Sequence, residues 1–168
     1  MLKLKKSALV FSLFWMMLLI NATISAQSTD IIGPTTAEQV RAEHSVFDIY
    51  MKRYTPDTAA VKYLSEIQDS VTIYVLFGTW CHDSKKQIPA FMKTLEEANN
   101  PKINVEYIAV SRKKAEPKEL VERWDLKLTP TFIIVRRNKE YGRIIEEPVT
   151  SLEGDLVSIL KSEPVSEE

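Results

Sequence analysis

Cysteine, histidine and glycine are all scarce in this chain of 168 residues, which contains one, two and four of them. A disulfide needs two thiols, so the single cysteine, Cys81, excludes a disulfide within the chain. His44 and His82 are far apart in the sequence and form no ligand spacing with Cys81, so no metal site is predicted. No glycine-rich phosphate loop is present, and no other cofactor is expected.

A surplus of positive charge is also lacking. The whole chain has a net charge of -1. Residues 1–26 contain three lysines and no acid, so the remainder has 19 basic and 23 acidic residues and a net charge of -4. A mildly acidic surface gives no reason to expect nucleic acid as a partner.

The first 26 residues have the pattern of a secretory signal peptide. Three lysines precede an apolar run at residues 8–20, and the segment ends in small residues at Ala26. The alternative is a retained membrane anchor, but the run is shorter than the roughly 20 residues that a spanning helix needs. We expect cleavage before Gln27, export to the periplasm and no stable membrane span afterwards. An odd thiol in an oxidising compartment must be buried, reactive or paired with another molecule.

Residues 27–64 are predicted to form a linker and a helical extension. Residues 27–34 carry no periodic pattern and are interpreted as a mobile linker. Thr35-Thr36-Ala37-Glu38 has the spacing of a capping box, and apolar residues then recur at helical intervals up to Tyr54. Thr55-Pro56 predicts the N-cap and first turn of a second helix.

Residues 65–161 are predicted to form the main domain, with an acidic, disordered tail at 162–168. The continuous apolar run at 71–77 is typical of a strand buried on both faces. The expected strands are 71–77, 103–110, 131–136 and 141–145, and the expected helices are 84–99, 117–125 and 150–161. This order predicts an α/β fold, with a central mixed sheet flanked by helices.

The sequence Trp80-Cys81-His82-Asp83-Ser84 stands between a predicted strand and a predicted helix. Pro89 follows the cysteine by eight residues, and Thr129-Pro130-Thr131 opens a later strand. In these motifs and in the order of its elements, the stretch 65–161 resembles the thioredoxin family. The Trp-Cys-x-x-Ser form and the helical extension look like an exported bacterial branch of it. The resemblance implies a thioredoxin-like fold with Cys81 at its reactive site.

A cysteine on the first turn of a helix faces unpaired N–H groups and the positive end of the helix dipole, and both favour the thiolate. Because the thiolate is the nucleophile, Cys81 is predicted to be catalytic. The alternative is a small buried hydrophobic residue. Ser84 occupies the family position of the second cysteine. Its hydroxyl could stabilise the thiolate, or it could cap and pack the first turn.

Five further residues complete the predicted site. Trp80 offers a flat apolar contact for a bound peptide, or packs in the core. His82, when protonated, would favour the thiolate, or it simply faces solvent. Asp83 suits a helix start but opposes the thiolate. By resemblance, Pro130 follows a cis peptide bond and lies against the cysteine, which leaves the Thr129 backbone free to pair with an extended substrate. The alternative is a proline that only opens a strand.

Two departures from the family pattern agree with each other. The second cysteine is absent, and Val75 stands where the resemblance implies a buried acid. That acid assists the attack of the second thiol, so neither is needed without the other. We therefore expect no dithiol reductase activity.

Two functions follow from this pattern. The first is monothiol exchange through mixed disulfides at Cys81, with protein or small-molecule thiols and disulfides as partners and an external thiol to resolve the product. The second is a non-catalytic peptide-binding or chaperone-like module on the same fold. A one-cysteine peroxidase would need proline, threonine and arginine around the thiol, and no such motif is present.

Overall fold

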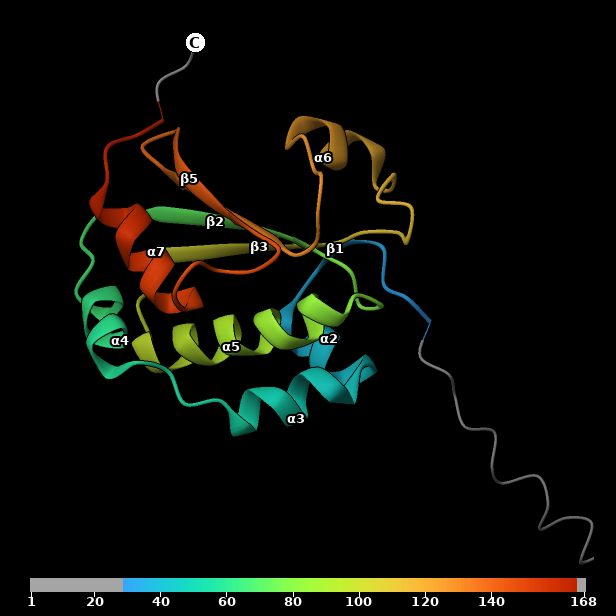
Figure 1. Cartoon of the computed structure of the whole chain (residues 1–168), viewed down its shortest axis with the longest axis horizontal. Helices are drawn as coiled ribbons and strands as arrows, with labels where there is room; N and C mark the ends of the chain where they lie inside the picture. Colours follow the sequence, from blue (N-terminus) through green and yellow to red (C-terminus); the bar gives the residue numbers. More distant parts are fainter. Residues whose placement is uncertain (1–28, 166–168) are drawn as a thin grey trace, which may run out of the picture.

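The computed structural model describes residues 29–165 (Figure 1). The predicted signal peptide and residues 166–168 of the predicted tail lie outside this range. Between residues 29 and 165, no helix has the length and apolar character needed to cross a membrane.

The centre of the fold is a five-stranded mixed sheet with the order β1-β3-β2-β4-β5. Strands β2 and β3 are parallel, and the other three pairings are antiparallel. The strands are β1 (Gly33–Thr35), β2 (Val71–Phe77), β3 (Ile103–Ala109), β4 (Thr131–Arg136) and β5 (Lys139–Ile145). The predicted mixed sheet is therefore confirmed, with its most apolar strand in the middle.

Six helices flank the sheet unequally. They are α2 (Ala37–Glu43), α3 (Ser45–Arg53), α4 (Thr58–Ser65), α5 (His82–Ala98), α6 (Lys118–Arg123) and α7 (Leu152–Lys161). Figure 1 shows α5 and α7 against one face of the sheet, with α3 and α4 packed outside them, whereas α6 stands alone over the other face. We call these the thick face and the thin face.

Successive side chains of β2 point to opposite faces of the sheet, so this strand contributes to the hydrophobic core on both faces. Ile73, Val75 and Phe77 belong to the large hydrophobic cluster of the thick face, whereas Leu76 belongs to the small cluster of the thin face. A strand that is buried on both faces must be apolar at nearly every position. The alternation explains the continuous apolar run of the sequence, including Val75, which is completely buried.

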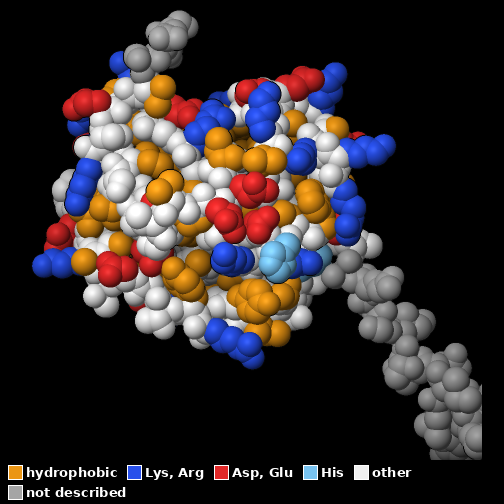
Figure 2. Space-filling view, viewed as in Figure 1, with side chains coloured by type: hydrophobic (Ala, Val, Ile, Leu, Met, Phe, Trp, Pro, Cys, Tyr) orange, Lys and Arg blue, Asp and Glu red, His pale blue; other side chains and the backbone are white. Residues whose placement is uncertain are grey.

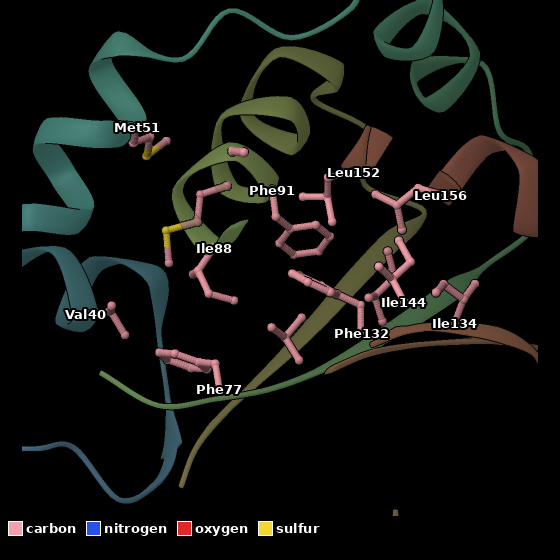
Figure 3. Close-up of a cluster of buried hydrophobic side chains, with 14 of the residues drawn as sticks. Val40, Met51, Phe77, Ile88, Phe91, Phe132, Ile134, Ile144, Leu152 and Leu156 are labelled. Atoms are coloured by element: carbon pink, nitrogen blue, oxygen red, sulfur yellow. The ribbon is translucent and has the colours of Figure 1, made fainter. Parts of the chain in front are cut away.

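The thick-face core is built around Phe91 of α5. Its ring lies 5.1 Å from that of Phe132 in β4 and 6.2 Å from that of Tyr107 in β3. Figure 3 shows Phe91 pointing toward Phe132, with Leu152 and Leu156 of α7 closing the cluster. The helix that carries the predicted site is thus anchored in the centre of the molecule.

The thin-face core is much smaller. Leu76, Ile108, Val110 and Ile133 are its buried members. Trp124, just after α6, covers them, and its ring lies 4.3 Å from that of Tyr74. This face therefore depends on one short helix and one aromatic pair.

The helical extension differs from the prediction in three details. The long first helix is two helices, because His44 leaves helical geometry (φ -127°, ψ 84°) between α2 and α3. The predicted N-cap at Thr55 is wrong, since Asp57 caps α4 by accepting a hydrogen bond from Ala60 N–H. Residues 33 and 34, predicted as linker, form β1 instead and pair with the edge of β3.

A buried acid ties the extension to the main domain. Glu153 of α7 is 3% exposed and accepts hydrogen bonds from the Tyr54 hydroxyl (2.8 and 3.1 Å) and from Asp57 N–H (3.0 Å). Burial, together with these bonds to a carboxylate, raises the pKa of Tyr54 well above its usual value. The predicted domain boundary at residue 65 stays a prediction, but Glu153 joins α7 to the end of α3 and the start of α4.

Candidate functional site

The turn that presents Cys81 is fixed by its own backbone. Cys81 is the N-cap of α5, and its N–H donates to Gly78 O (3.0 Å), while its carbonyl accepts the first helical hydrogen bond from Lys85 N–H (3.1 Å). A Cβ on Gly78 would lie 2.5 Å from the Trp80 ring, so a side chain there would displace the indole. Four residues therefore carry the chain from the end of β2 to the start of α5.

The thiol of Cys81 faces the Thr129–Pro130 peptide bond, which is cis. Its Sγ donates a hydrogen bond to Thr129 O at 3.2 Å, and the residue is 8% exposed. The two motifs, 48 residues apart in the sequence, thus meet in one site. Only the protonated thiol can make this hydrogen bond, so ionisation of Cys81 releases the Thr129 carbonyl.

Ser84 lies one turn into α5 and is completely buried. Its hydroxyl accepts a hydrogen bond from Gly78 N–H (3.2 Å). Within residues 29–165 no hydrogen bond joins Ser84 to Cys81. This geometry matches the packing alternative, in which Ser84 stabilises the turn that positions Cys81; its predicted catalytic role stays a prediction.

Trp80 is held in place by two groups that sequence reasoning did not assign to the site. Its indole Nε1 donates to Val110 O (3.0 Å), and the guanidinium of Arg112 lies 6.0 Å from its ring centroid. Arg112 in turn forms an ion pair with Asp30 (2.8 Å). The basic run at 112–114 is visible in the sequence, but its pairing with a residue 82 positions earlier is not.

His82 and Asp83 occupy the first turn of α5, beside Cys81. His82 is exposed and Asp83 is half-buried. In the described part of the chain, neither side chain forms a hydrogen bond or an ion pair. The structure therefore places both next to the thiol without linking either to it, and an acid in the first turn of a helix is electrostatically favourable.

The loop after β5 forms the other wall of the site. Glu146 N–H donates to Pro130 O (2.7 Å), and Glu147 forms an ion pair with Lys86 of α5 (3.5 Å). Figure 2 shows acidic side chains gathered in the middle of this face, next to basic ones. The loop and α5 therefore flank the cis peptide bond from opposite sides.

Cys81 and Thr129 are both almost fully buried, so little of either residue is open to solvent. A cleft of about 330 Å³ lies at the other end of the sheet, beside Tyr63 and Arg136. No group of three His, Cys, Asp or Glu side chains in residues 29–165 could hold a metal ion. The arrangement places one thiol sulfur directly beside the carbonyl of a buried residue, Thr129.

Three comparisons with known proteins bear on this site. A family model described as thioredoxin matches residues 35–153, which include the helical extension. Among solved structures, a Pseudomonas aeruginosa protein of unknown function is 20% identical, with 77% of this chain and 81% of that chain covered and a TM-score of 0.55. An HIV epitope scaffold is 18% identical, with 77% and 93% covered and a TM-score of 0.59. No curated protein matches. At such identities the structural likeness shows the fold alone.

Proposed function

The chain belongs to the thioredoxin family, and from this premise we propose that it is an exported monothiol protein acting in thiol–disulfide exchange at Cys81. The observation that carries the proposal is the position of the thiol. Sγ stands at the N-terminus of a 17-residue helix and 3.2 Å from the carbonyl that precedes a cis proline. The free N–H groups and dipole of the helix favour the nucleophilic thiolate.

The reaction needs no second thiol in this chain. The Cys81 thiolate attacks one sulfur of a partner disulfide, the S–S bond breaks, and a new S–S bond joins Cys81 to the partner. The displaced sulfur leaves with the electron pair and takes a proton from solvent. An external thiolate then attacks the partner sulfur of the mixed disulfide, so that a new S–S bond joins the external thiol to the partner. The Cys81 sulfur leaves with the electron pair of the broken bond and takes up a proton. The external thiol supplies the electrons, so the protein can support reduction or shuffling of partner disulfides.

The hydrogen bond from Cys81 to Thr129 O links chemistry to partner binding. While the thiol is protonated, the carbonyl is occupied. When the thiolate forms, the carbonyl becomes free to accept an N–H from an extended partner segment, as in strand addition. Trp80, clamped by Val110 and Arg112, provides a fixed apolar contact next to it.

The second candidate is a non-catalytic peptide-binding module. The burial of Cys81 and its hydrogen bond as a neutral thiol favour this alternative. The two candidates differ in one variant. If the protein acts by thiol–disulfide exchange, Cys81→Ala should abolish its function. If it is a binding module, Cys81→Ala should leave partner binding intact.

The first experiment uses the chain from residue 27 and bis(2-hydroxyethyl) disulfide, a small neutral substrate. Intact mass follows the mixed disulfide at Cys81 over time and pH, and Cys81→Ser is the control. We expect a mixed disulfide that an added thiol removes, at a rate that rises with pH as the thiolate forms. A wild-type chain that reacts no faster than a denatured one would contradict the proposal and favour the binding module.

Export is tested separately. Expression of the full chain in a bacterial host with a periplasm should give an exported product whose mass corresponds to cleavage between Ala26 and Gln27. An uncleaved product in the membrane fraction would instead support the retained anchor.

A further inference from the structure

A shallow apolar depression lies between α3 and α5, the helix that has Cys81 as its N-cap. Its volume is about 200 Å³, and it is lined by Tyr50, Arg53, Tyr54, Lys86 and Ala90. Figure 2 shows hydrophobic side chains over α3 separated by basic ones. Neither the sequence nor the site described above assigns this surface a role.

The depression is connected to Cys81 along α5. His82, Lys86 and Ala90 are spaced four residues apart, so they share one face of the helix. At 1.5 Å per residue, Lys86 and Ala90 lie roughly 7 and 14 Å along the axis from Cys81. An extended chain covers about 3.3 Å per residue, so the depression is within about three or four residues of a partner cysteine bound at Cys81.

The positive charge of the depression favours a ligand that carries a negative charge. Its lining has two cations, Arg53 and Lys86, and no carboxylate. Arg53 is exposed and forms no ion pair within residues 29–165. Lys86 meets only Glu147, at 3.5 Å, and both of these side chains are 63% exposed, so this pair is weak.

The floor of the depression is aromatic. Tyr50 is 44% exposed, which leaves its ring available for contact. The Tyr54 hydroxyl is already committed to Glu153, so Tyr54 presents its ring in a fixed position. An aromatic or aliphatic side chain could pack on the two tyrosine rings, and a carboxylate next to it could pair with Arg53 or Lys86.

We propose that this depression is a specificity subsite for partner polypeptides that carry an aromatic or aliphatic residue next to an acid, three or four residues from the cysteine that reacts with Cys81. The inference rests on the proposed exchange reaction and names its class of substrate. The helical extension then has a role in the site, because α3 supplies Tyr50 and Arg53.

The test compares two peptides of equal length, each with one cysteine blocked as a mixed disulfide with 2-mercaptoethanol. One carries Phe-Glu at three and four residues on either side of the cysteine, and the other carries Ser-Gln there. Intact mass gives the rate at which Cys81 is joined to the peptide and mercaptoethanol is displaced. The variants are Tyr50→Ala and Arg53→Gln, with Lys118→Gln on α6 as the matched surface control.

We expect wild type and Lys118→Gln to react about tenfold faster with the Phe-Glu peptide, which corresponds to about 1.4 kcal/mol. Tyr50→Ala and Arg53→Gln should lose most of this preference while reacting normally with bis(2-hydroxyethyl) disulfide. Equal rates for both peptides in wild type, or a preference retained in both variants, would overturn the subsite.

Failure of the exchange proposal is distinguishable from failure of the subsite. If no disulfide reacts, exchange fails, and equilibrium binding of Cys81→Ala protein to the same peptides with serine in place of cysteine decides the subsite. Tighter binding of the Phe-Glu peptide that Tyr50→Ala removes supports it. Equal binding of the two peptides overturns it.

Discussion

The two faces of the sheet are built to different depths. The thick face has two layers of helices around Phe91 and Phe132, whereas the thin face has α6 and the Tyr74–Trp124 pair. The two halves of the site are divided between them, since Cys81 begins the thick-face helix α5 and Thr129 follows the thin-face helix α6. Cys81 thus stands on the half with the larger core, and Thr129, whose carbonyl accepts its hydrogen bond, follows the helix that covers the smaller core.

The largest expected effect tests the thick face. Phe91→Ala removes a fully buried ring that contacts both β3 and β4. We expect a loss of about 3–5 kcal/mol in the free energy of unfolding, because a large cavity remains in a packed core. Urea denaturation measures it, with Ile49→Ala on exposed α3 as the control. A loss below about 1 kcal/mol, the level of a surface change, would show that this face can collapse around the gap.

A smaller and more local effect is expected on the thin face. Trp124→Ala removes a half-buried ring and the aromatic pair with Tyr74, and should lower the free energy of unfolding by about 1–3 kcal/mol. Because α6 leads into the Thr129–Pro130 loop, amide exchange should increase in residues 118–130 more than in α5. Alkylation of Cys81 should become faster as the carbonyl that binds it moves. Uniform exchange across both faces would refute the unequal division.

The smallest expected change in the free energy of unfolding comes from the ion pair between Asp69 and Arg136, at the end of the sheet opposite Cys81. Hydrogen bonding to Arg136 is the main reason that the pKa of Asp69 lies below its ordinary value of 3.8. A lowered folded-state pKa means that the ionised form stabilises the fold above the unfolded pKa, and that this stability is lost as the pH falls through the folded pKa.

The corresponding measurement is the urea midpoint of Asp69→Asn and wild type between pH 7 and pH 2.5. The advantage of wild type should be constant above about pH 5 and should shrink at lower pH. Glu66→Gln, which replaces an exposed acid three residues away, is the matched control variant. A wild-type advantage that does not change with pH would mean that the ion pair contributes nothing.

The sequence predicts the elements whose signal is local. The apolar run of β2 and the strand at Thr131–Arg136 appear with the predicted bounds, and the fold class is confirmed. Strand β1 could not be predicted, because three residues carry no periodicity and are extended only through pairing with β3. The break at His44 was also missed, since apolar spacing continues across it while the backbone turns.

In the candidate site, too, the residues with a local sequence motif were predicted, and the contacts that depend on the folded chain were not. Sequence motifs named Cys81 and Thr129–Pro130, which the structure brings together. They could not show that the Ser84 hydroxyl is used by Gly78, because that depends on the tight turn between them. The Asp30–Arg112 pair and the depression beside Tyr50 join segments far apart in the sequence, so only the folded chain brings them together.

The path of the chain through the molecule has a practical consequence for how it can be tethered. Asp30 and Ile31 lie against Arg112 and Thr79, at the end of the sheet that bears Cys81. Val165 donates to Glu140 O near the start of β5, and the seven residues of this strand span roughly 23 Å toward the Cys81 end of the sheet. An attachment at the first described residues would therefore hold the reactive sulfur close to whatever carries the chain. A carrier joined at the other terminus would leave the end of the sheet that bears Cys81 unobstructed by the carrier.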